Sequence, residues 1–134
     1  MGTERRAAID IGTVTARLLV ADVGDGAIRE VARRSTITHL GEGWSDAGVL
    51  SEAGMTRACD AIASFVTEAR ELGAVRTVAV ATSASRDAVN SAEFLDRLER
   101  IGVRPEVIPG DREGYLTFLG ATYGFCDERV MVVD

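Results

Sequence analysis

Short apolar runs separated by turn residues open the chain and predict strands. The runs over residues 7–11 and 15–23 are each long enough for one strand, and Gly24-Asp25-Gly26 is typical of a β-hairpin turn leading into a third strand over residues 27–38. We therefore expect three antiparallel strands at the start of the fold.

A helical pattern begins after residue 50. Ser51 is a typical N-cap residue, and Gly73 a typical C-terminal residue, for a helix whose apolar positions recur every three or four residues. The pattern predicts one helix with a buried face. Its apolar positions are Met55, Ala58, Cys59, Ile62, Phe65, Val66, Ala69 and Leu72.

Strands and helices alternate after this helix. The nearly continuous apolar run over residues 75–81 is typical of a central strand covered on both faces by helices. Asn90 and Glu93 resemble a capping box at the start of a short helix that Gly102 ends. The next strand is expected over residues 104–108.

The last part of the chain repeats this alternation. Asp111 is expected to cap a helix over residues 112–123, and the apolar run over residues 129–133 predicts a final strand that stops at Asp134, as a cut through a longer sequence would. The order βββαβαβα with a final strand predicts an α/β domain with a mixed five-stranded sheet flanked by helices.

Composition and charge exclude several classes of protein. Of 134 residues, 46% are hydrophobic and 27% charged, as is usual for one globular domain. The net charge of −6 argues against a nucleic-acid partner, and no apolar run reaches the roughly 18 residues of a membrane span. We expect a cytoplasmic protein. The cysteines, Cys59 and Cys126, and the single histidine, His39, are too few for a disulfide scaffold, a multi-histidine metal site or a histidine-based triad.

The turn after the first strand carries the first candidate chemistry. Asp10-Ile11-Gly12 ends this strand, and the chain turns through Thr13 and Thr15 into the second. Such a turn can present backbone N–H groups to an anion, while the Asp holds a hydrated divalent cation. A plain hairpin with an Asp at its turn explains the same residues, so this stretch alone leaves both interpretations open.

Two later segments lie at the same edge of the predicted sheet. Ser83, Ser85 and Arg86 follow the strand over residues 75–81, at the end where open α/β sheets bind ligands, and they favour a polyanion. Ordinary capping and a solvated surface charge are the simpler explanations. Glu113 falls in the first turn of the next helix, where it could orient an attacking water or only interact with the helix dipole.

Trp44 lies in a glycine-rich loop, Gly41 to Gly48. Its ring could cover the cleft beside these segments, or it could anchor the loop by being buried. We expect the anchoring role, because burial of a large ring stabilises a loop.

In this order and spacing, the segments resemble the exopolyphosphatase and guanosine pentaphosphate phosphohydrolase family, Ppx/GppA. Residues 10–18 match its phosphate loop, Asp-x-Gly-(Ser/Thr)-Asn-Ser-x-Arg-Leu, although Val14-Thr15 stands where the family has Asn-Ser. Gly114 stands where the family has Ala. The resemblance extends over nearly the whole chain through Leu40-Gly41-Glu42-Gly43, Leu50-Ser51-Glu52, Ala81 to Ala84 with Arg86, Ala88 and Asn90, and Gly110 to Glu113.

The resemblance implies a fold and a set of site residues. The fold would be an actin-like ATPase (ribonuclease H-like) domain, with residues 1–134 as the first, N-terminal domain of a two-domain phosphatase that is cut at the start of a second phosphate loop. Glu113 would be the catalytic residue, and Asp10 and Asp134 would hold Mg²⁺ or another divalent cation. The phosphate-binding residues would be Gly12, Thr13, Val14, Thr15, Arg17, Ser83, Arg86 and Asn90.

The same resemblance implies an exopolyphosphatase that releases terminal orthophosphate from polyphosphate and is inactive, or nearly so, as this domain alone. The alternative within the family is a phosphohydrolase of guanosine pentaphosphate. An alternative from another class is a non-catalytic, nucleotide-binding actin-like domain. The family also implies a homodimer of the full-length protein, while the net charge and the length of the apolar runs argue against nucleic acid and membrane as partners.

Overall fold

The fold is built on one mixed sheet of five strands, in the order β3-β2-β1-β4-β5. The computed structural model describes residues 2–44, 47–125 and 129–133. Strands β1 (Glu4–Ile11), β2 (Thr15–Gly24) and β3 (Ala27–Ile37) are antiparallel neighbours, as the sequence predicts. β4 (Arg76–Ala81) and β5 (Glu106–Val107) continue the sheet in parallel with β1.

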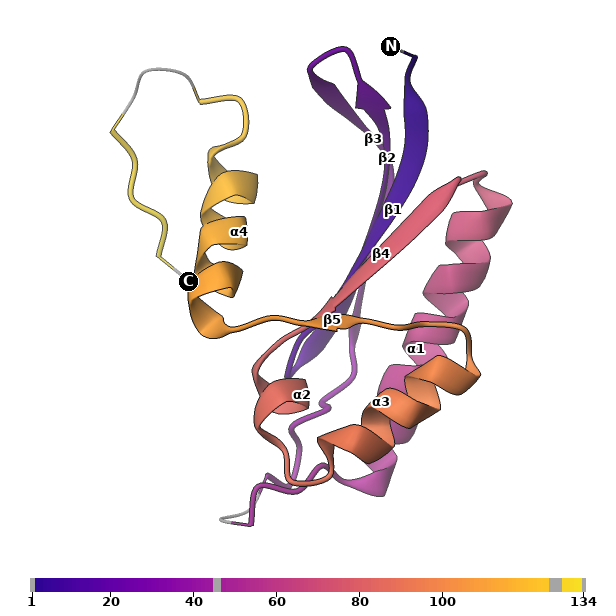
Figure 1. Cartoon of the computed structure of the whole chain (residues 1–134), viewed down its shortest axis with the longest axis vertical. Coiled ribbons are helices and arrows are strands. Elements are labelled where there is room, and N and C mark those ends of the chain that lie inside the picture. Colours follow the sequence, from indigo (N-terminus) through magenta and orange to yellow (C-terminus); the bar gives the residue numbers. More distant parts are fainter. Residues whose placement is uncertain (1, 45–46, 126–128, 134) are drawn as a thin grey trace.

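Among the described residues, four helices flank this sheet. The long helix α1 (Glu52–Glu71) and the short helix α3 (Ser91–Arg100) lie together against one face, and α4 (Gly110–Thr122) stands on the opposite side of the sheet (Figure 1). One turn of helix, α2 (Ser83–Asp87), follows β4. The sequence pattern did not predict α2. The predicted α/β class, with a mixed five-stranded sheet flanked by helices, is confirmed.

Local signals place the first hairpin and the long helix correctly. Asp25 and Gly26 have φ of 53° and 72°, the left-handed angles that a tight hairpin turn between twisted strands requires. At the start of α1, the Ser51 side chain accepts a hydrogen bond of 3.0 Å from the Gly54 N–H, and Gly73 ends the helix with φ of 81°.

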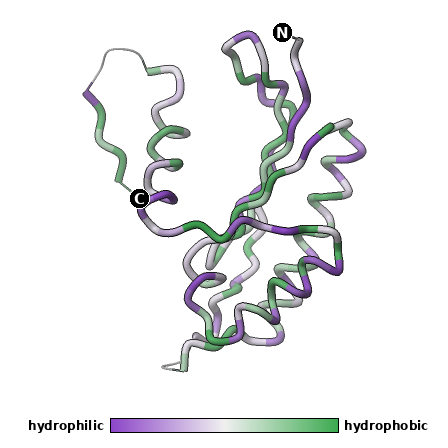
Figure 2. Tube along the Cα trace, in the orientation of Figure 1, coloured by the Kyte–Doolittle hydropathy of each residue, from purple (hydrophilic) through white to green (hydrophobic). Residues whose placement is uncertain are grey.

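The hydrophobic core lies between the sheet and α1. Because side chains alternate across a strand, Ile9 and Ile11 of β1 and Leu18 of β2 face this helix and are almost fully buried. Ile62 and Phe65 of α1 belong to the same buried cluster. In Figure 2 the crossing region of the strands is accordingly rich in hydrophobic residues. Asp10 and Arg17, which are candidate site residues, lie on the opposite face of the sheet.

The prediction that β4 is covered on both faces was wrong. Val78, in the middle of β4, is 47% exposed. α1 and α3 cover one face of the sheet, whereas no side chain of α4, a helix that the structure describes in full, is buried against the other.

The predicted final strand was also wrong. Residues 129–133 form no strand, and Met131 and Val133 are each 86% exposed. A strand needs a neighbour to accept and donate its backbone hydrogen bonds, and this segment lies beyond α4, away from the sheet (Figure 1).

Three details at element ends differ from prediction. The strand expected over residues 104–108 is only the two residues of β5. Helix α4 begins at Gly110 with Pro109 as its N-cap, so Asp111 lies inside the first turn, where it accepts from its neighbour Arg112 N–H. Asn90 occupies the N-cap position of α3 but makes no capping hydrogen bond, because its amide is used elsewhere.

Candidate active site

The end of β1 places a carboxylate and a guanidinium on the sheet face opposite the core. Asp10 pairs with Arg17 across the β1–β2 ladder, and Arg17 Nη1 lies 3.7 Å from Asp10 Oδ2. Both side chains are partly open to solvent. A charged pair of this kind is available to a charged ligand.

The turn from Gly12 to Thr15 is held by its own backbone and by the loop after β3. Gly12 N–H donates to Thr15 O at 3.1 Å, and a Cβ at Gly12 would lie 2.8 Å from that oxygen, which only glycine avoids. Gly41 N–H donates to Thr13 O at 2.9 Å. The Gly12 N–H is therefore engaged inside the turn, while the Thr13 and Val14 N–H groups take no part in these bonds.

A hydroxyl pair joins this turn to the segment after β4. Thr13 Oγ1 and Ser83 Oγ share a hydrogen bond of 2.8 Å. The contact arises because β4 lies beside β1 in parallel, so that their carboxyl ends meet at one edge of the sheet. Thr82, which the sequence did not single out, completes the junction by donating its backbone N–H to Ile11 O at 3.2 Å.

Arg86 is fixed by three hydrogen bonds at this edge. Its Nε and Nη2 bind the two oxygens of Asp87 at 2.9 and 3.1 Å, and its Nη1 donates to Ile108 O at 3.0 Å. The hydrogen bonds to Asp87 raise the pKa of the guanidinium above its ordinary value. Since a guanidinium has five donors, two N–H groups remain for a ligand.

Glu113 approaches Arg86 from the first turn of α4. Glu113 Oε2 lies 3.9 Å from Arg86 Nη1, and the carboxylate is half-buried. Glu113, Asp10 and Arg17 line one cavity of about 310 Å³. Its other lining residues are Val80, Thr82, Ile108, Leu116 and Thr117.

Several predicted site residues lie outside this cavity. Asn90 is the clearest case, because its Oδ1 accepts from Leu50 N–H at 2.9 Å and its Nδ2 donates to Leu50 O at 3.0 Å. We therefore assign Asn90 to the framework of the domain and leave it out of the proposed site. Val14 is exposed, and its carbonyl accepts from Thr38 and His39 N–H groups.

Three further residues complete the comparison with the sequence. Asp134, expected to face Asp10, lies outside the described residues. Ser85 is buried, so its hydroxyl is not open to a ligand from solvent. Trp44 is 41% exposed and lines a second cavity with Thr13 and Ser83, so the expectation that its ring is buried to anchor the loop was wrong.

Asp10 and the cavity suit Mg²⁺ in one particular way. Among the described residues, no group of three or more His, Cys, Asp or Glu side chains could form a metal site by themselves. Mg²⁺ is usually held by one or two carboxylates together with substrate phosphates and waters, rather than by an all-protein cage. The Asp10 carboxylate in a polar cavity fits that kind of ligand set.

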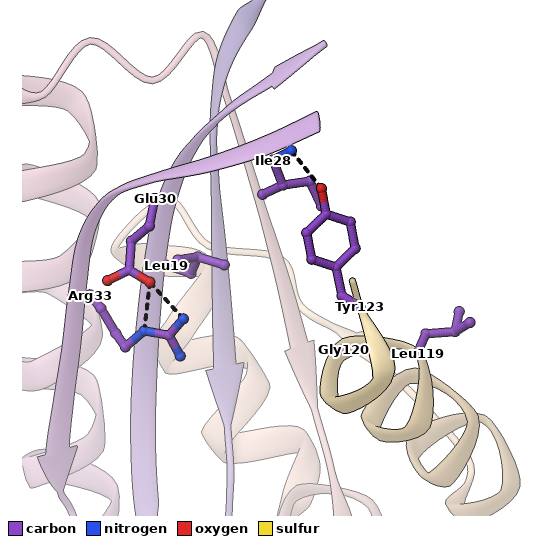
Figure 3. Close-up of a pocket in the computed structure, with 7 residues that line it drawn as sticks. All are labelled: Leu19, Ile28, Glu30, Arg33, Leu119, Gly120 and Tyr123. Atoms are coloured by element: carbon purple, nitrogen blue, oxygen red, sulfur yellow. Dashed lines mark hydrogen bonds and ion pairs between the residues drawn. The ribbon is translucent and has the colours of Figure 1, made fainter. Parts of the chain in front are cut away.

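A larger cavity, of about 510 Å³, lies between α4 and the β2–β3 hairpin. Apolar side chains such as Leu19, Ile28 and Leu119 line it together with the Glu30–Arg33 ion pair (Figure 3). None of the site residues expected from the sequence lines this cavity. Its only carboxylate is engaged by a neighbouring arginine, so the smaller cavity beside Glu113 is the better candidate for phosphate chemistry.

The described residues contain no helix that is both long and apolar enough to cross a bilayer.

The domain is thus an α/β fold whose mixed sheet gathers Asp10, Arg17, Arg86 and Glu113 near one edge. The model of the Ppx/GppA phosphatase family matches residues 19–134, and the chain belongs to that family. The predicted actin-like ATPase fold is confirmed by solved structures of family members.

Named relatives and solved structures agree with this assignment. Exopolyphosphatase 2 of Mycobacterium tuberculosis is 37% identical over 146 residues, and the match covers 100% of this chain and 46% of the relative. Exopolyphosphatase 1 of Mycobacterium bovis is 31% identical, and the match covers 97% of this chain and 39% of the relative. The Ppx/GppA family member of Aquifex aeolicus superposes with a TM-score of 0.85 at 34% identity, over 92% of this chain and 41% of that one. An exopolyphosphatase of Cytophaga hutchinsonii superposes with a TM-score of 0.84 at 30% sequence identity. The match covers 91% of this chain and 39% of that one. The chain thus spans less than half the length of these relatives.

Proposed function

We propose that this chain is the first domain of an exopolyphosphatase, a hydrolase that releases terminal orthophosphate from inorganic polyphosphate with Mg²⁺ as cofactor. The observation that carries the proposal is the single cavity shared by Asp10, Arg17 and Glu113, which come from three separate elements. The names of the relatives support polyphosphate as the substrate. We also propose a homodimer for the complete protein, as the family resemblance implies, and a cytoplasmic location, as expected from the sequence.

In this proposal Glu113 acts on water. Its carboxylate accepts a proton as the water oxygen attacks the terminal phosphorus, and the bond from that phosphorus to the bridging oxygen breaks. The products are orthophosphate and a chain shorter by one phosphate. Arg86, 3.9 Å from Glu113, and Arg17 bind phosphate oxygens, because the planar guanidinium matches them with two N–H groups.

Asp10 would hold Mg²⁺ beside this cavity, with Asp134 as the second carboxylate that the family resemblance implies. When bound, the ion would offset the charge of the phosphate oxygens in the transition state. Thr13 and Ser83, whose hydroxyls share one hydrogen bond, would accept or donate to the same phosphates.

The decisive experiment measures orthophosphate release by the complete gene product, with long-chain polyphosphate and with guanosine pentaphosphate, in the presence of Mg²⁺ or of a chelator. General-base catalysis contributes about 10²–10⁴ in rate, so Glu113→Gln should lower kcat by at least about 10². Glu99→Gln is the matched control, because Glu99 is an exposed carboxylate on α3 that pairs with Arg104. Equal loss in both variants would contradict the role of Glu113.

The same assay separates the alternatives. A higher kcat/KM for guanosine pentaphosphate than for polyphosphate would identify the pentaphosphate phosphohydrolase. Binding of a nucleotide without release of phosphate from either substrate would identify the non-catalytic, nucleotide-binding domain.

The 134-residue chain alone is expected to be inactive or nearly so. In this cavity Asp10 is the one described carboxylate that the proposal assigns to the metal ion, because Glu113 is assigned to the water, and the proposal requires a second carboxylate. Release of phosphate by this chain at the rate of the complete gene product would contradict the need for a second domain.

A further inference from the structure

Thr117 is a polar residue of the cavity beside Glu113 to which the proposed function gives no role. The polar residues that line this cavity are Asp10, Arg17, Thr82, Glu113 and Thr117. The proposed function assigns Asp10 to the metal ion, Arg17 to phosphate and Glu113 to water. The hydroxyl of Thr82, a buried residue, donates to Ile11 O at 3.4 Å. The hydroxyl of Thr117 therefore remains to be explained.

Thr117 and Glu113 lie on the side of α4 that faces the cavity. In an α-helix, residues four positions apart are neighbours on one face, with about 5–6 Å between their Cβ atoms. From Gly110 to Ala121, a stretch that the structure describes in full, Glu113 and Thr117 are the only residues that are not exposed. Because both line the same cavity, their side chains share one small volume.

The hydroxyl of Thr117 is not used by its own helix. A threonine inside a helix can donate to the carbonyl oxygen four residues earlier. Thr67 in α1 and Thr122 in α4 do so, at 3.0 and 2.7 Å. Among the described residues, the Thr117 hydroxyl has no hydrogen-bond partner, and Glu113 O, four positions earlier, does not accept from it. Its one donor and two acceptor sites are thus available to a ligand in the cavity.

A water that attacks phosphorus needs more than one partner to be oriented. A single hydrogen bond to Glu113 leaves the water free to rotate about that bond, whereas a second bond fixes the direction of the attacking lone pair. A hydroxyl oxygen can accept this second bond, and it adds no negative charge beside the phosphates. Thr117 is suited to this task, because its hydroxyl lies in the same cavity and has no other described partner.

We propose that Thr117 is a second catalytic residue, whose hydroxyl oxygen accepts a hydrogen bond from the attacking water while Glu113 accepts the proton that leaves it. The inference rests on the proposed function for the reaction and for the place of Glu113 in it. The water oxygen forms a bond to the terminal phosphorus, the bond from phosphorus to the bridging oxygen breaks, and its electron pair stays on the shortened chain. One water proton goes to Glu113, and the proton that faces Thr117 stays on the oxygen that becomes part of orthophosphate.

Valine and serine at position 117 separate the hydroxyl from the methyl group. Thr117→Val keeps the shape of the side chain and lacks the hydroxyl, whereas Thr117→Ser keeps the hydroxyl and lacks the methyl group. The variants are made in the complete gene product and assayed with Mg²⁺ and with whichever of polyphosphate and guanosine pentaphosphate it hydrolyses faster. Valine should lower kcat by about tenfold, the effect of one hydrogen bond, and serine should retain most of it. KM should stay within about twofold in both, because the hydroxyl acts on the water and not on the substrate.

Thr122→Val is the matched control, because Thr122 lies on the same helix and its hydroxyl donates to Phe118 O. We expect this control to keep kcat. A rise in KM alone in Thr117→Val would assign Thr117 to substrate binding and overturn the proposal. A loss with serine as large as that with valine would assign the effect to packing of the methyl group and overturn it too. If Thr117→Val does not fold, Thr117→Ala provides the same comparison with serine.

A double variant tests whether Thr117 and Glu113 act on one water. Residues that act as a unit have effects that do not multiply. In the Glu113→Gln background the carboxylate no longer takes the proton, so Thr117→Val should lower kcat there by less than about threefold, against about tenfold in the parent. Effects that multiply fully would place the two residues in different steps and overturn the proposal.

The proposed function and this inference fail in different ways. A complete gene product that releases phosphate, with the same kcat in Thr117→Val, would overturn the inference and leave the hydrolase intact. A complete gene product that hydrolyses neither substrate would overturn the proposed function and the role of Thr117 with it.

Discussion

The phenol oxygen of Tyr123 accepts a hydrogen bond of 2.9 Å from the backbone N–H of Ile28, at the edge strand of the sheet. This bond ties the C-terminal end of α4 to β3 across the cavity between α4 and the β2–β3 hairpin (Figure 3). Since α4 carries Glu113 at its other end and buries no side chain, its position depends on few contacts.

Tyr123→Phe should therefore loosen α4 without unfolding the domain. The variant loses one hydrogen bond, which contributes about 0.5–1.5 kcal/mol, and the amides of α4 should exchange with solvent faster while those of α1 do not. Hydrogen exchange with mass spectrometry measures both helices in one experiment. Tyr115→Phe, an exposed tyrosine on the same helix, is the control, and equal exchange in all three proteins would show that the bond does not hold α4.

A substitution at Asn90 tests whether this residue belongs to the framework of the domain or binds phosphate. Its amide satisfies both the N–H and the carbonyl of Leu50, a buried residue forty positions earlier, and a buried backbone group without a partner costs about 1–3 kcal/mol. Asn90→Ala should lower the free energy of unfolding, measured with urea, by about 2 kcal/mol. If instead the variant keeps its stability and raises KM for polyphosphate in the complete gene product, Asn90 belongs to the phosphate site after all.

These contacts show which features of the fold can be predicted from residues that are close together in the sequence. The turn at Asp25-Gly26 and the cap at Ser51 depend on residues within four positions, so their signals could be read directly. The bond between Asn90 and Leu50 has no local signal, and Asn90 looks like a cap because its sequence context is that of a cap. Only two residues of β5 pair with β4, and local hydrophobicity does not indicate how many residues of a segment find a neighbouring strand.

The site shows the same division. The rule that ligands bind at the carboxyl ends of parallel strands correctly brings Asp10, Arg86 and Glu113 to one edge. The rule says nothing about which atoms remain available there. Asp87 was not singled out, although it follows Arg86 directly in the sequence, because its hydrogen bonds to Arg86 and its place in a cavity with Trp44 are seen only in the folded chain.

Arg5 and Asp22 predict a dependence of stability on pH. The hydrogen bonds from Arg5 hold the pKa of the Asp22 carboxyl below its ordinary value, and Arg5 also donates to Leu72 O at the end of α1. Because the pKa is lower in the folded state, the stabilisation is present at neutral pH and is lost as the pH falls below about 4. Asp22→Asn should lower the Tm at pH 7 and differ less from the parent at pH 3. A difference that is the same at both pH values would assign the effect of the variant to something other than this charge.

Substitution by alanine is expected to have opposite effects on stability at Gly12 and at Gly114. At Gly12, a Cβ would lie 2.8 Å from Thr15 O, so Gly12→Ala must displace the backbone of the phosphate turn. We expect it to lower the free energy of unfolding by about 1–3 kcal/mol and to reduce phosphate release by the complete gene product.

At Gly114, inside α4, nothing lies within 4 Å of the added atom, and alanine is favoured over glycine in a helix by about 1 kcal/mol. Gly114→Ala should therefore stabilise α4 beside Glu113, with phosphate release retained. Urea unfolding of both variants gives the comparison, and destabilisation by Gly114→Ala would mean that α4 packs more closely at this position than the open space around Gly114 indicates.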